Sequence, residues 1–178
     1  MNKEDIVTYT VTGEDICSAP ITMSSLEKED LDWSTPVPYQ KVNENAVEPT
    51  RGSAAAAGYD LYAATIEPTV IEPHCTVKVS TGIAVELPNN TFGAIFARSG
   101  LATKQGLRPA NCVGVVDSDY RGPIIVAVHN DTDEPQTIQP HDRIAQLVVM
   151  PYVQIKFHEV AELKETERGA GGFGSTGV

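Results

Sequence analysis

From Val42 onward, hydrophobic and polar positions alternate in short segments. Between residues 77 and 87 the large apolar side chains stand at odd positions, with polar residues between them, which is the period-two pattern of a strand with one buried face. Further strands are predicted at 91–97, 124–129 and 144–149. The last two are so rich in apolar residues that we expect both of their faces to be buried.

Helical patterns are scarce in this sequence. Outside the N-terminal region no segment carries an apolar stripe of period 3.6, and we expect only one helical turn, after Ser99. Proline and glycine interrupt the chain roughly every ten residues, as they do in folds built from short strands. The sequence therefore predicts an all-β domain, a jelly roll or a related β-sandwich.

The two ends of the chain differ in composition from the part between them. Residues 1–40 are acidic, with only Lys3 and Lys28 as countercharges, and carry a capping-type pattern for one short helix. Residues 164–178 are rich in glycine. We therefore divide the chain into an acidic extension, a β domain (41–163) and a flexible C-terminal arm. The extension either docks an unidentified partner or is a solvated tail.

The charge of the chain argues against some classes of function. A formal net charge of -11 over 178 residues opposes binding to nucleic acid, because neutralising phosphates requires a basic face. No run of about eighteen apolar residues occurs, so we expect no membrane span and no membrane partner. The polar N-terminus lacks the features of a signal peptide. We therefore expect an intracellular protein of the cytoplasm or the nucleus.

Cysteine and histidine do not form recognisable disulfide or metal patterns. Cys17, Cys75 and Cys112 are odd in number and far apart, which argues against a disulfide framework, and we expect them to be reduced and at least half-buried. The four histidines lack the close spacings that place two ligands on one metal ion. A structural metal site is therefore not expected.

Two blocks of glycine and polar residues are candidates for binding anions or metal. Asp60 stands at an apolar strand start, where it either pairs with an arginine such as Arg143 or helps to hold a hydrated metal ion. A second strand ends in Arg98, Ser99 and Gly100, so that a guanidinium, a hydroxyl and main-chain N–H groups can face one phosphate. The alternative for Arg98 is a surface salt bridge.

The block 111–122 is the richest in candidate chemistry. Gly114 interrupts an apolar strand, which is typical of a bulge or of close backbone approach, so a planar ligand could meet exposed main-chain groups there. Asp117 stands at the mouth of this hairpin, where an ionised carboxylate can act as a general base toward water. The alternative is an ordinary β-turn, because the run of Asp, Ser, Tyr, Arg and Gly after Val116 is common turn chemistry.

Two further blocks lie toward the C-terminus. Gln146 is an amide in a nearly continuous apolar strand, and a buried amide must bond either to neighbouring main chain or to a ligand. The segment 168–177 places Arg168 and Phe173 among glycines, so it is either a frayed end or a lid that a nucleotide would order. It is not a P-loop, because the Lys-Ser/Thr pair that should follow the glycines is missing.

Taken in order, these five blocks resemble the five motifs of the trimeric deoxyuridine triphosphatase (dUTPase) family: AGYDLYA, ARSGLA, GVVDSDYRG, DRIAQL and RGAGGFGSTG. The resemblance covers roughly residues 42–178. It implies a jelly-roll homotrimer whose active sites lie at subunit junctions, with the C-terminal arm exchanged between subunits. The implied activity is hydrolysis of dUTP to dUMP and pyrophosphate by water attack at the α-phosphate. This reaction limits uracil in DNA and supplies dUMP for dTTP synthesis.

The same resemblance implies roles for individual residues. Asp117 would orient and deprotonate the water, Tyr120 would pack under the deoxyribose, and Asp60 would lie near the waters of a metal ion. The phosphates would contact Arg98, Ser99, Gly100 and Gln146, and uracil would lie against Asn111, Gly114, Val115 and Val116. The arm would close over the substrate with Arg168, Phe173, Gly174, Ser175 and Thr176, Phe173 stacking on uracil.

Mg²⁺ is the expected cofactor. Attack at the α-phosphorus requires that the charge of the triphosphate be neutralised, and an acidic chain achieves this with Mg²⁺ and inserted arginines. The ion would be held mainly by the substrate and water, because Mg²⁺ usually keeps several waters. Two alternatives remain, a dCTP deaminase of related fold and a binding or regulatory protein on the same scaffold.

Overall fold

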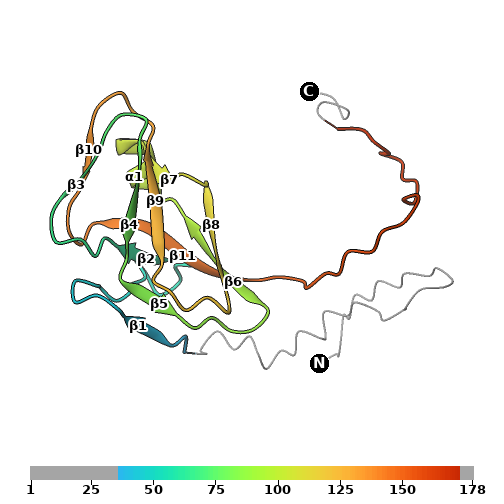
Figure 1. The fold of residues 1–178 in the computed structure, drawn as a ribbon, viewed down its shortest axis with the longest axis horizontal. Helices are drawn as coiled ribbons and strands as arrows, with labels where there is room; N and C mark the ends of the chain where they lie inside the picture. Colours follow the sequence, from blue (N-terminus) through green and yellow to red (C-terminus); the bar gives the residue numbers. More distant parts are fainter. Residues whose placement is uncertain (1–35, 173–178) are drawn as a thin grey trace, which may run out of the picture.

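The structure is a computed structural model that describes residues 36–172, most of which form a β-sandwich with one short helix (Figure 1). The all-β prediction is confirmed. The elements in chain order are β1 (Tyr39–Lys41), β2 (Tyr59–Tyr62), β3 (Thr69–Ile71), β4 (Thr76–Ser80), β5 (Ile83–Val85), β6 (Thr91–Phe96), α1 (Ser99–Gln105), β7 (Leu107–Pro109), β8 (Val113–Asp117), β9 (Ile125–Asn130), β10 (Gln136–Ile138) and β11 (Arg143–Pro151).

The strands form two larger sheets and two short pairs, all antiparallel. One sheet has the order β2-β11-β6-β8, the other has the order β4-β9-β7, and β1-β5 and β10-β3 form the pairs. Residues from ten of the eleven strands meet in one apolar core, in which Leu61, Ile71 and Val128 are fully buried. Burial of such a core is the main favourable term for folding. β8 is an outer strand of its sheet, and this position matters for the site.

The alternation predicted for 77–87 is present, but it belongs to two strands. Gly82, with a φ of 64°, separates β4 from β5, and a side chain there would collide with Asn43 and Ala46. Positive φ at this position suits glycine. The strands predicted at 91–97 and 144–149 correspond to β6 and β11.

The prediction that 124–129 and 144–149 are buried on both faces was wrong. In β9, Val126 and Val128 are buried whereas Ile125 is 52% exposed, and in β11 Val148 is only half-buried. At these positions the strand packs one face on the core and leaves the other at least partly open among the described residues. The apolar composition of these strands therefore exceeds what the described residues bury.

The helical turn predicted after Ser99 is α1. It ends at Gly106, which adopts a left-handed φ of 63° and donates its N–H to the carbonyl of Leu101, a common way to end a helix. A methyl group at Gly106 would also collide with Thr132. This stop leads the chain directly into β7.

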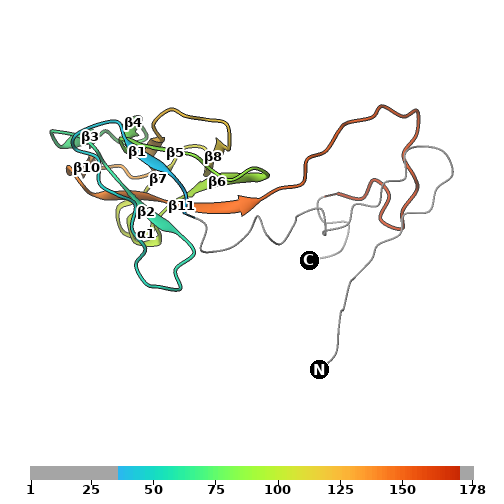
Figure 2. The ribbon, with the colours of Figure 1, turned by 90° about the horizontal axis from the view of Figure 1, so that it is seen from below.

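After β11 the chain leaves the sandwich. Residues 152–172 form no helix or strand and extend away from the sheets in both views (Figures 1 and 2). Their large apolar side chains are uncovered: Phe157 is 91% exposed and Leu163 is 86% exposed. We call residues 152–172 the C-terminal segment. The domain boundaries at 40 and 163 stay predictions, and residues 1–35 lie outside the described part.

The cysteine prediction was partly wrong. Cys75 and Cys112 are free thiols, but both are exposed rather than half-buried, because each lies in a turn between strands. Cys17 lies outside the described residues. Within 36–172 no three His, Cys, Asp or Glu side chains form a metal-binding group, and no helix is long and apolar enough to cross a membrane.

Candidate active site

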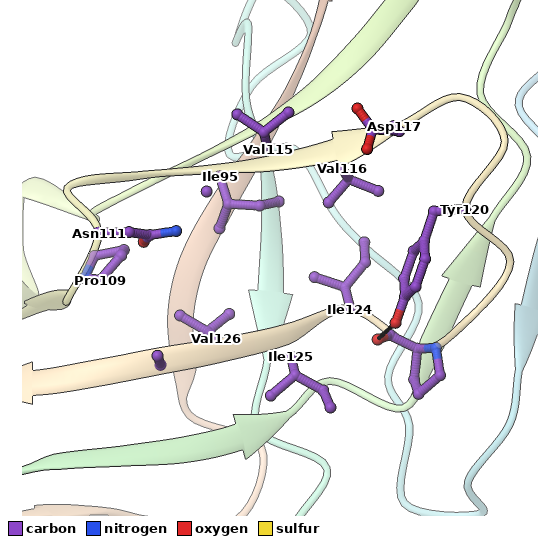
Figure 3. Close-up of a pocket in the computed structure, with 13 residues that line it drawn as sticks. Ile95, Pro109, Asn111, Val115, Val116, Asp117, Tyr120, Ile124, Ile125 and Val126 are labelled. Carbon is purple, nitrogen blue, oxygen red and sulfur yellow. Dashed lines mark hydrogen bonds between the residues drawn. The ribbon is translucent and has the colours of Figure 1, made fainter.

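A cavity of about 260 Å³ lies between β8 and β9. We call it the hairpin cavity. Figure 3 shows Asn111 at one end and Asp117 with Tyr120 at the other. Its lining also contains Ile95, Pro109, Gly114, Val115, Val116, Pro123, Ile124, Ile125, Val126 and Ala127. The cavity is therefore apolar along its length and polar at both ends.

The turn before β8 positions the Asn111 end. Cys112 adopts a left-handed φ of 62°, which is uncommon for a residue with a side chain. Its N–H donates to the carbonyl of Pro109 at 3.0 Å, and the N–H of Val113 donates to the carbonyl of Asn111 at 2.7 Å. These bonds close a tight turn that fixes Asn111 beside the cavity.

Gly114 does not form the bulge that the sequence suggested. β8 pairs with β6 residue by residue from Val113 to Asp117, without a break in register. A Cβ atom at Gly114 would instead lie 3.1 Å from Cβ of Ile95 and 3.5 Å from Nδ2 of Asn111. The glycine therefore gives space to its neighbours on β6 and in the turn.

Asp117 is the last residue of β8, and its carboxylate stands at the rim of the hairpin cavity. The carbonyl of Asp117 accepts the N–H of Tyr120 at 3.1 Å, so a turn holds these two residues together. The carboxylate is exposed and makes no side-chain hydrogen bond or ion pair within 36–172. It can therefore accept a proton from a bound water.

Tyr120 and Arg121 stabilise the loop after β8. The Tyr120 hydroxyl donates to the carbonyl of Pro123 at 3.1 Å, the bond drawn in Figure 3. Arg121 donates through Nη1 to the carbonyls of Ser118 (2.6 Å) and Tyr120 (3.1 Å). Sequence reasoning did not assign Arg121, although its place between Tyr120 and a glycine in the third motif was a usable signal.

A second cavity, of about 560 Å³, lies beside β2, β11 and the start of α1. We call it the arginine cavity. It contains five of the predicted site residues, Asp60, Arg98, Ser99, Gly100 and Gln146, and it is completed by Gly52, Ala56, Ala57, Gly58, Phe96, Arg143 and Val148. Ser99 and Gly100 open the first turn of α1, where main-chain N–H groups have no partner within the helix.

Asp60 bridges two arginines in this cavity. Its Oδ1 accepts Nε of Arg98 at 2.7 Å, and its Oδ2 accepts Nη1 of Arg143 at 3.2 Å and Nη2 of Arg98 at 3.5 Å. The Asp60 side chain is only 13% exposed. This confirms the pairing with Arg143 and shows that Asp60 orients both guanidinium groups.

Gln146 has the main-chain partner that its position required. Its Nε2 donates to the carbonyl of Ala97 at 2.9 Å, and the second N–H of the same amide is left for a ligand. A Cβ atom at Gly58 would lie 2.6 Å from Oε1 of Gln146. The glycine on the approach to β2 therefore makes room for this amide.

The two cavities lie on opposite faces of the four-stranded sheet. Ile95 lines the hairpin cavity and its neighbour Phe96 lines the arginine cavity, and adjacent side chains of a strand point to opposite faces. Asp117, which pairs with Phe92 on β6, lines only the hairpin cavity, and Arg98 lines only the arginine cavity, so one chain does not bring them into a common cavity. Arg168 lines neither cavity. Its Nε donates to the carbonyl of Gly171 at 3.0 Å in the C-terminal segment.

Comparison with known proteins decides the family. The sequence model described as dUTPase matches residues 44–177, which include both cavities and the C-terminal segment. The chain belongs to the dUTPase family. A curated relative from Desulfitobacterium hafniense, a deoxyuridine 5'-triphosphate nucleotidohydrolase, is 53% identical over 131 residues, covering 73% of this chain and 87% of the relative.

Solved dUTPase structures share the fold of this family member. A mutant of the Staphylococcus bacteriophage 80alpha dUTPase with dUpNHpp superposes with a TM-score of 0.74 at 28% identity, covering 82% of this chain and all of that one. A mutant dUTPase from phage phi11 of S. aureus, described with a structural Mg(II) ion, gives a TM-score of 0.65 at 25% identity, over 72% and 98% of the two chains. The dUTPase-like jelly roll is thereby confirmed.

An ion-pair cluster lies behind the Asn111 end of this dUTPase-family site. Asp131 accepts Nε and Nη2 of Arg108 at 2.7 and 2.9 Å, and this hydrogen bonding is the main cause that lowers the pKa of Asp131. His129 lies 3.5 Å from the same carboxylate and contacts Thr76 at 2.9 Å. The cluster joins β7 to the end of β9, next to Pro109 of the cavity.

Proposed function

We propose that the hairpin cavity binds the deoxyuridine part of dUTP and that Asp117 activates the attacking water. The reaction is that of the family: dUTP and water give dUMP and pyrophosphate. The observation that carries the proposal is the Asp117 carboxylate, exposed at the rim of an apolar cavity and beside the ring of Tyr120. As a general base it takes a proton from water while the water oxygen attacks the α-phosphorus, and pyrophosphate leaves.

Uracil recognition is proposed for the main chain of β8. β8 is an outer strand, so the N–H and C=O groups on its free edge have no partner strand among the described residues 36–172. Uracil presents an alternating donor and acceptor edge that such a strand can match, with Asn111 contributing at the turn. Cytosine would leave these groups unpaired, and thymine carries a 5-methyl group that a tight hairpin excludes. Val115, which is 64% exposed, and Val116 flank this edge.

The phosphates are proposed to bind in the arginine cavity of another copy of the chain. Arg98, Ser99, Gly100 and Gln146 gather there, and none of them lines the hairpin cavity with Asp117. The two cavities of one chain share no lining residue, so we do not expect one bound nucleotide to span both of them. A homotrimer that places the arginine cavity of one subunit against the hairpin cavity of the next solves this problem, and ring closure by three identical contacts is a common symmetry.

The exposed C-terminal segment supports the exchange of an arm in this trimer. Four of its large apolar side chains are 60–91% exposed, namely Val153, Ile155, Phe157 and Leu163. This is more apolar surface than an isolated segment of this length usually presents to water. Contact with a neighbouring subunit would cover these side chains. It would also carry Arg168 to the substrate, together with Phe173, Gly174, Ser175 and Thr176, which lie outside the described residues.

Mg²⁺ is the cofactor of the dUTPase reaction, and the residues present fit it. The carboxylate of Asp60 is occupied by two arginines, and 36–172 contain no cluster of three ligating side chains. An ion bound mainly by triphosphate oxygens and water, with Asp60 at most in indirect contact, is consistent with this arrangement. When bound, Mg²⁺ neutralises charge on the triphosphate. Arg98 and Arg143 supply the remaining positive charge from the protein.

Release of pyrophosphate from dUTP, dTTP, dCTP and UTP, with and without Mg²⁺, tests the activity. We expect release from dUTP alone, dependent on Mg²⁺. Ammonia released from dCTP would instead identify a deaminase, and a folded protein inert toward all four nucleotides would favour a binding or regulatory role. We propose the cytoplasm or the nucleus as the place of action.

The shared site has a test of its own. Asp117→Asn and Arg98→Ala homotrimers should both be nearly inactive, whereas trimers reassembled from a mixture of the two should regain part of the activity. Mixed trimers contain some sites with an intact Asp117 from one subunit and an intact Arg98 from another. A mixture that stays as inactive as its parents would place both residues in the site of a single chain.

A further inference from the structure

Gly122 lies directly against the ring of Tyr120. A Cβ atom built on Gly122 would collide with the Tyr120 hydroxyl and would lie 2.6 Å from Cζ and 3.0 Å from Cε2. These three nearest atoms all belong to the hydroxyl end of the ring. Carbon atoms in contact prefer a separation of about 3.5–4.0 Å. The ring therefore occupies the space that any side chain at 122 would need.

The main chain does not explain why this position is a glycine. Among the described glycines, positive φ occurs at Gly82, Gly106 and Gly169, and Gly122 is not one of them. An L-amino acid can therefore adopt the backbone conformation at 122 without the strain of the left-handed region. The requirement for glycine comes from Tyr120 and not from the turn.

Tyr120 is held on this glycine by two other contacts. Its hydroxyl donates to the carbonyl of Pro123 at 3.1 Å, and its N–H donates to the carbonyl of Asp117 at 3.1 Å. The ring lines the hairpin cavity at the end where Asp117 stands (Figure 3). The depth of the ring beside Gly122 therefore sets the distance between the ring and the cavity space next to the Asp117 carboxylate.

We propose that Gly122 is a positioning residue that determines selectivity for the deoxyribose of the substrate. Because Gly122 has no side chain, the Tyr120 ring can lie directly against it. At this depth the space above the ring accommodates a 2'-deoxy sugar but is too small for a 2'-hydroxyl. This inference rests on the proposed function, in which Tyr120 lies under the sugar. Gly122 touches neither the substrate nor the water and acts only through the ring.

Gly122→Ala is the test. To restore contact distance, Cζ of Tyr120 must move by about 1 Å, and an error of that size in the binding geometry can cost on the order of a hundredfold in rate. We expect kcat/KM for dUTP to fall ten- to a hundredfold, mainly through KM, as an order of magnitude. The ratio of kcat/KM for dUTP to that for UTP should change. A ring pushed into the cavity obstructs the 2'-hydroxyl of UTP more than the deoxyribose and raises the ratio, whereas a ring pushed out of the cavity admits UTP and lowers it.

A double-mutant comparison separates the ring from the turn. In a Tyr120→Ala background the collision partner is gone, so adding Gly122→Ala should change the dUTP/UTP ratio less than twofold, which would show that the effects of the two substitutions are strongly coupled. Asp119→Ala is the matched control, because Asp119 is exposed in the same turn and lines neither cavity. It should leave the ratio unchanged.

Two results would overturn the proposal. One is an unchanged dUTP/UTP ratio in Gly122→Ala, and the other is an equal change in ratio with and without the Tyr120 ring, which would assign the effect to folding of the turn. A crystal structure of Gly122→Ala decides the contact independently of activity. The proposal expects a ring displaced by about 1 Å, and an undisplaced ring contradicts it even if the wild-type protein proves inert toward dUTP, a result that would refute only the proposed function.

Discussion

Replacing Asp60 by alanine should destabilise the protein through the two arginines that it bridges. The carboxylate is 13% exposed, and its partners are Arg98, 25% exposed, and Arg143, 49% exposed. Removal of the acceptor leaves two guanidinium groups facing each other without a counterion. The variant therefore loses favourable hydrogen bonds and gains repulsion between like charges.

The size of the effect follows from the geometry of each bond. The 2.7 Å bond from Arg98 is short and mostly shielded from water, so it contributes about 2 kcal/mol, within the usual range for hydrogen bonds to charged groups. The 3.2 Å bond from Arg143 is half exposed and contributes about 0.5 kcal/mol after discounting for solvent. The free energy of unfolding should therefore fall by roughly 2–3 kcal/mol in Asp60→Ala.

Urea unfolding followed by far-UV circular dichroism measures this change. Trp33, the single tryptophan, lies outside the described residues, so circular dichroism is preferred to tryptophan fluorescence here. Asp119→Ala serves as the control and should change the free energy of unfolding by less than about 0.5 kcal/mol. A change below 0.5 kcal/mol for Asp60→Ala as well would refute the view that Asp60 holds the arginines in place.

Three further predictions concern other parts of the molecule. Gly58→Ala should push the amide of Gln146 away from its bond to Ala97, lowering kcat/KM by about tenfold with little change in melting temperature. Because the pKa of Asp131 is lowered mainly by Arg108, the stability it contributes is present above about pH 4 and is lost as the pH falls through the folded-state value. Arg108→Gln should therefore flatten the acid limb of a stability-against-pH curve, and a limb as steep as that of the wild type would contradict this. Truncation before Arg168 should reduce dUTP hydrolysis far more than it shifts the melting temperature, and equal losses would make the arm a structural element.

The sequence predicted the strands because the pattern that defines them is local. Alternation between 77 and 87 identified the segments of β4 and β5, and glycine and proline marked the turns between strands. The burial of β9 could not be predicted in the same way. Whether Ile125 is covered depends on what packs on the outer face of its sheet, and a strand shared with another subunit looks apolar on both faces.

The residue types of the site were predictable, but their arrangement was not. Asp60, Arg98 and Gln146 form one cavity, and Asn111, Asp117 and Tyr120 form another. The separation depends on where along the paired strands each residue lies: Asp117 pairs with Phe92 at one end of β6 and Gln146 pairs with Phe96 at the other, a property of strand register that the motifs do not encode.

The proposed role of Gly122 could not be predicted from the sequence either. A glycine in a turn ordinarily suggests a requirement for positive φ. Only the structure shows that φ at 122 is not positive and that the Tyr120 ring fills the space. A contact between a side chain and the Cα atom of a nearby residue produces no periodic pattern in the sequence.

The measurement that tests the account most directly compares the wild-type protein with Asp117→Asn. Pyrophosphate release from dUTP and the affinity for a non-hydrolysable dUTP analogue should be measured on the same preparations. The account predicts an affinity within about threefold and a turnover reduced by roughly two to four orders of magnitude, because an amide has the shape of the carboxylate but cannot take the proton. Unchanged turnover in Asp117→Asn would contradict the central claim that this carboxylate activates water.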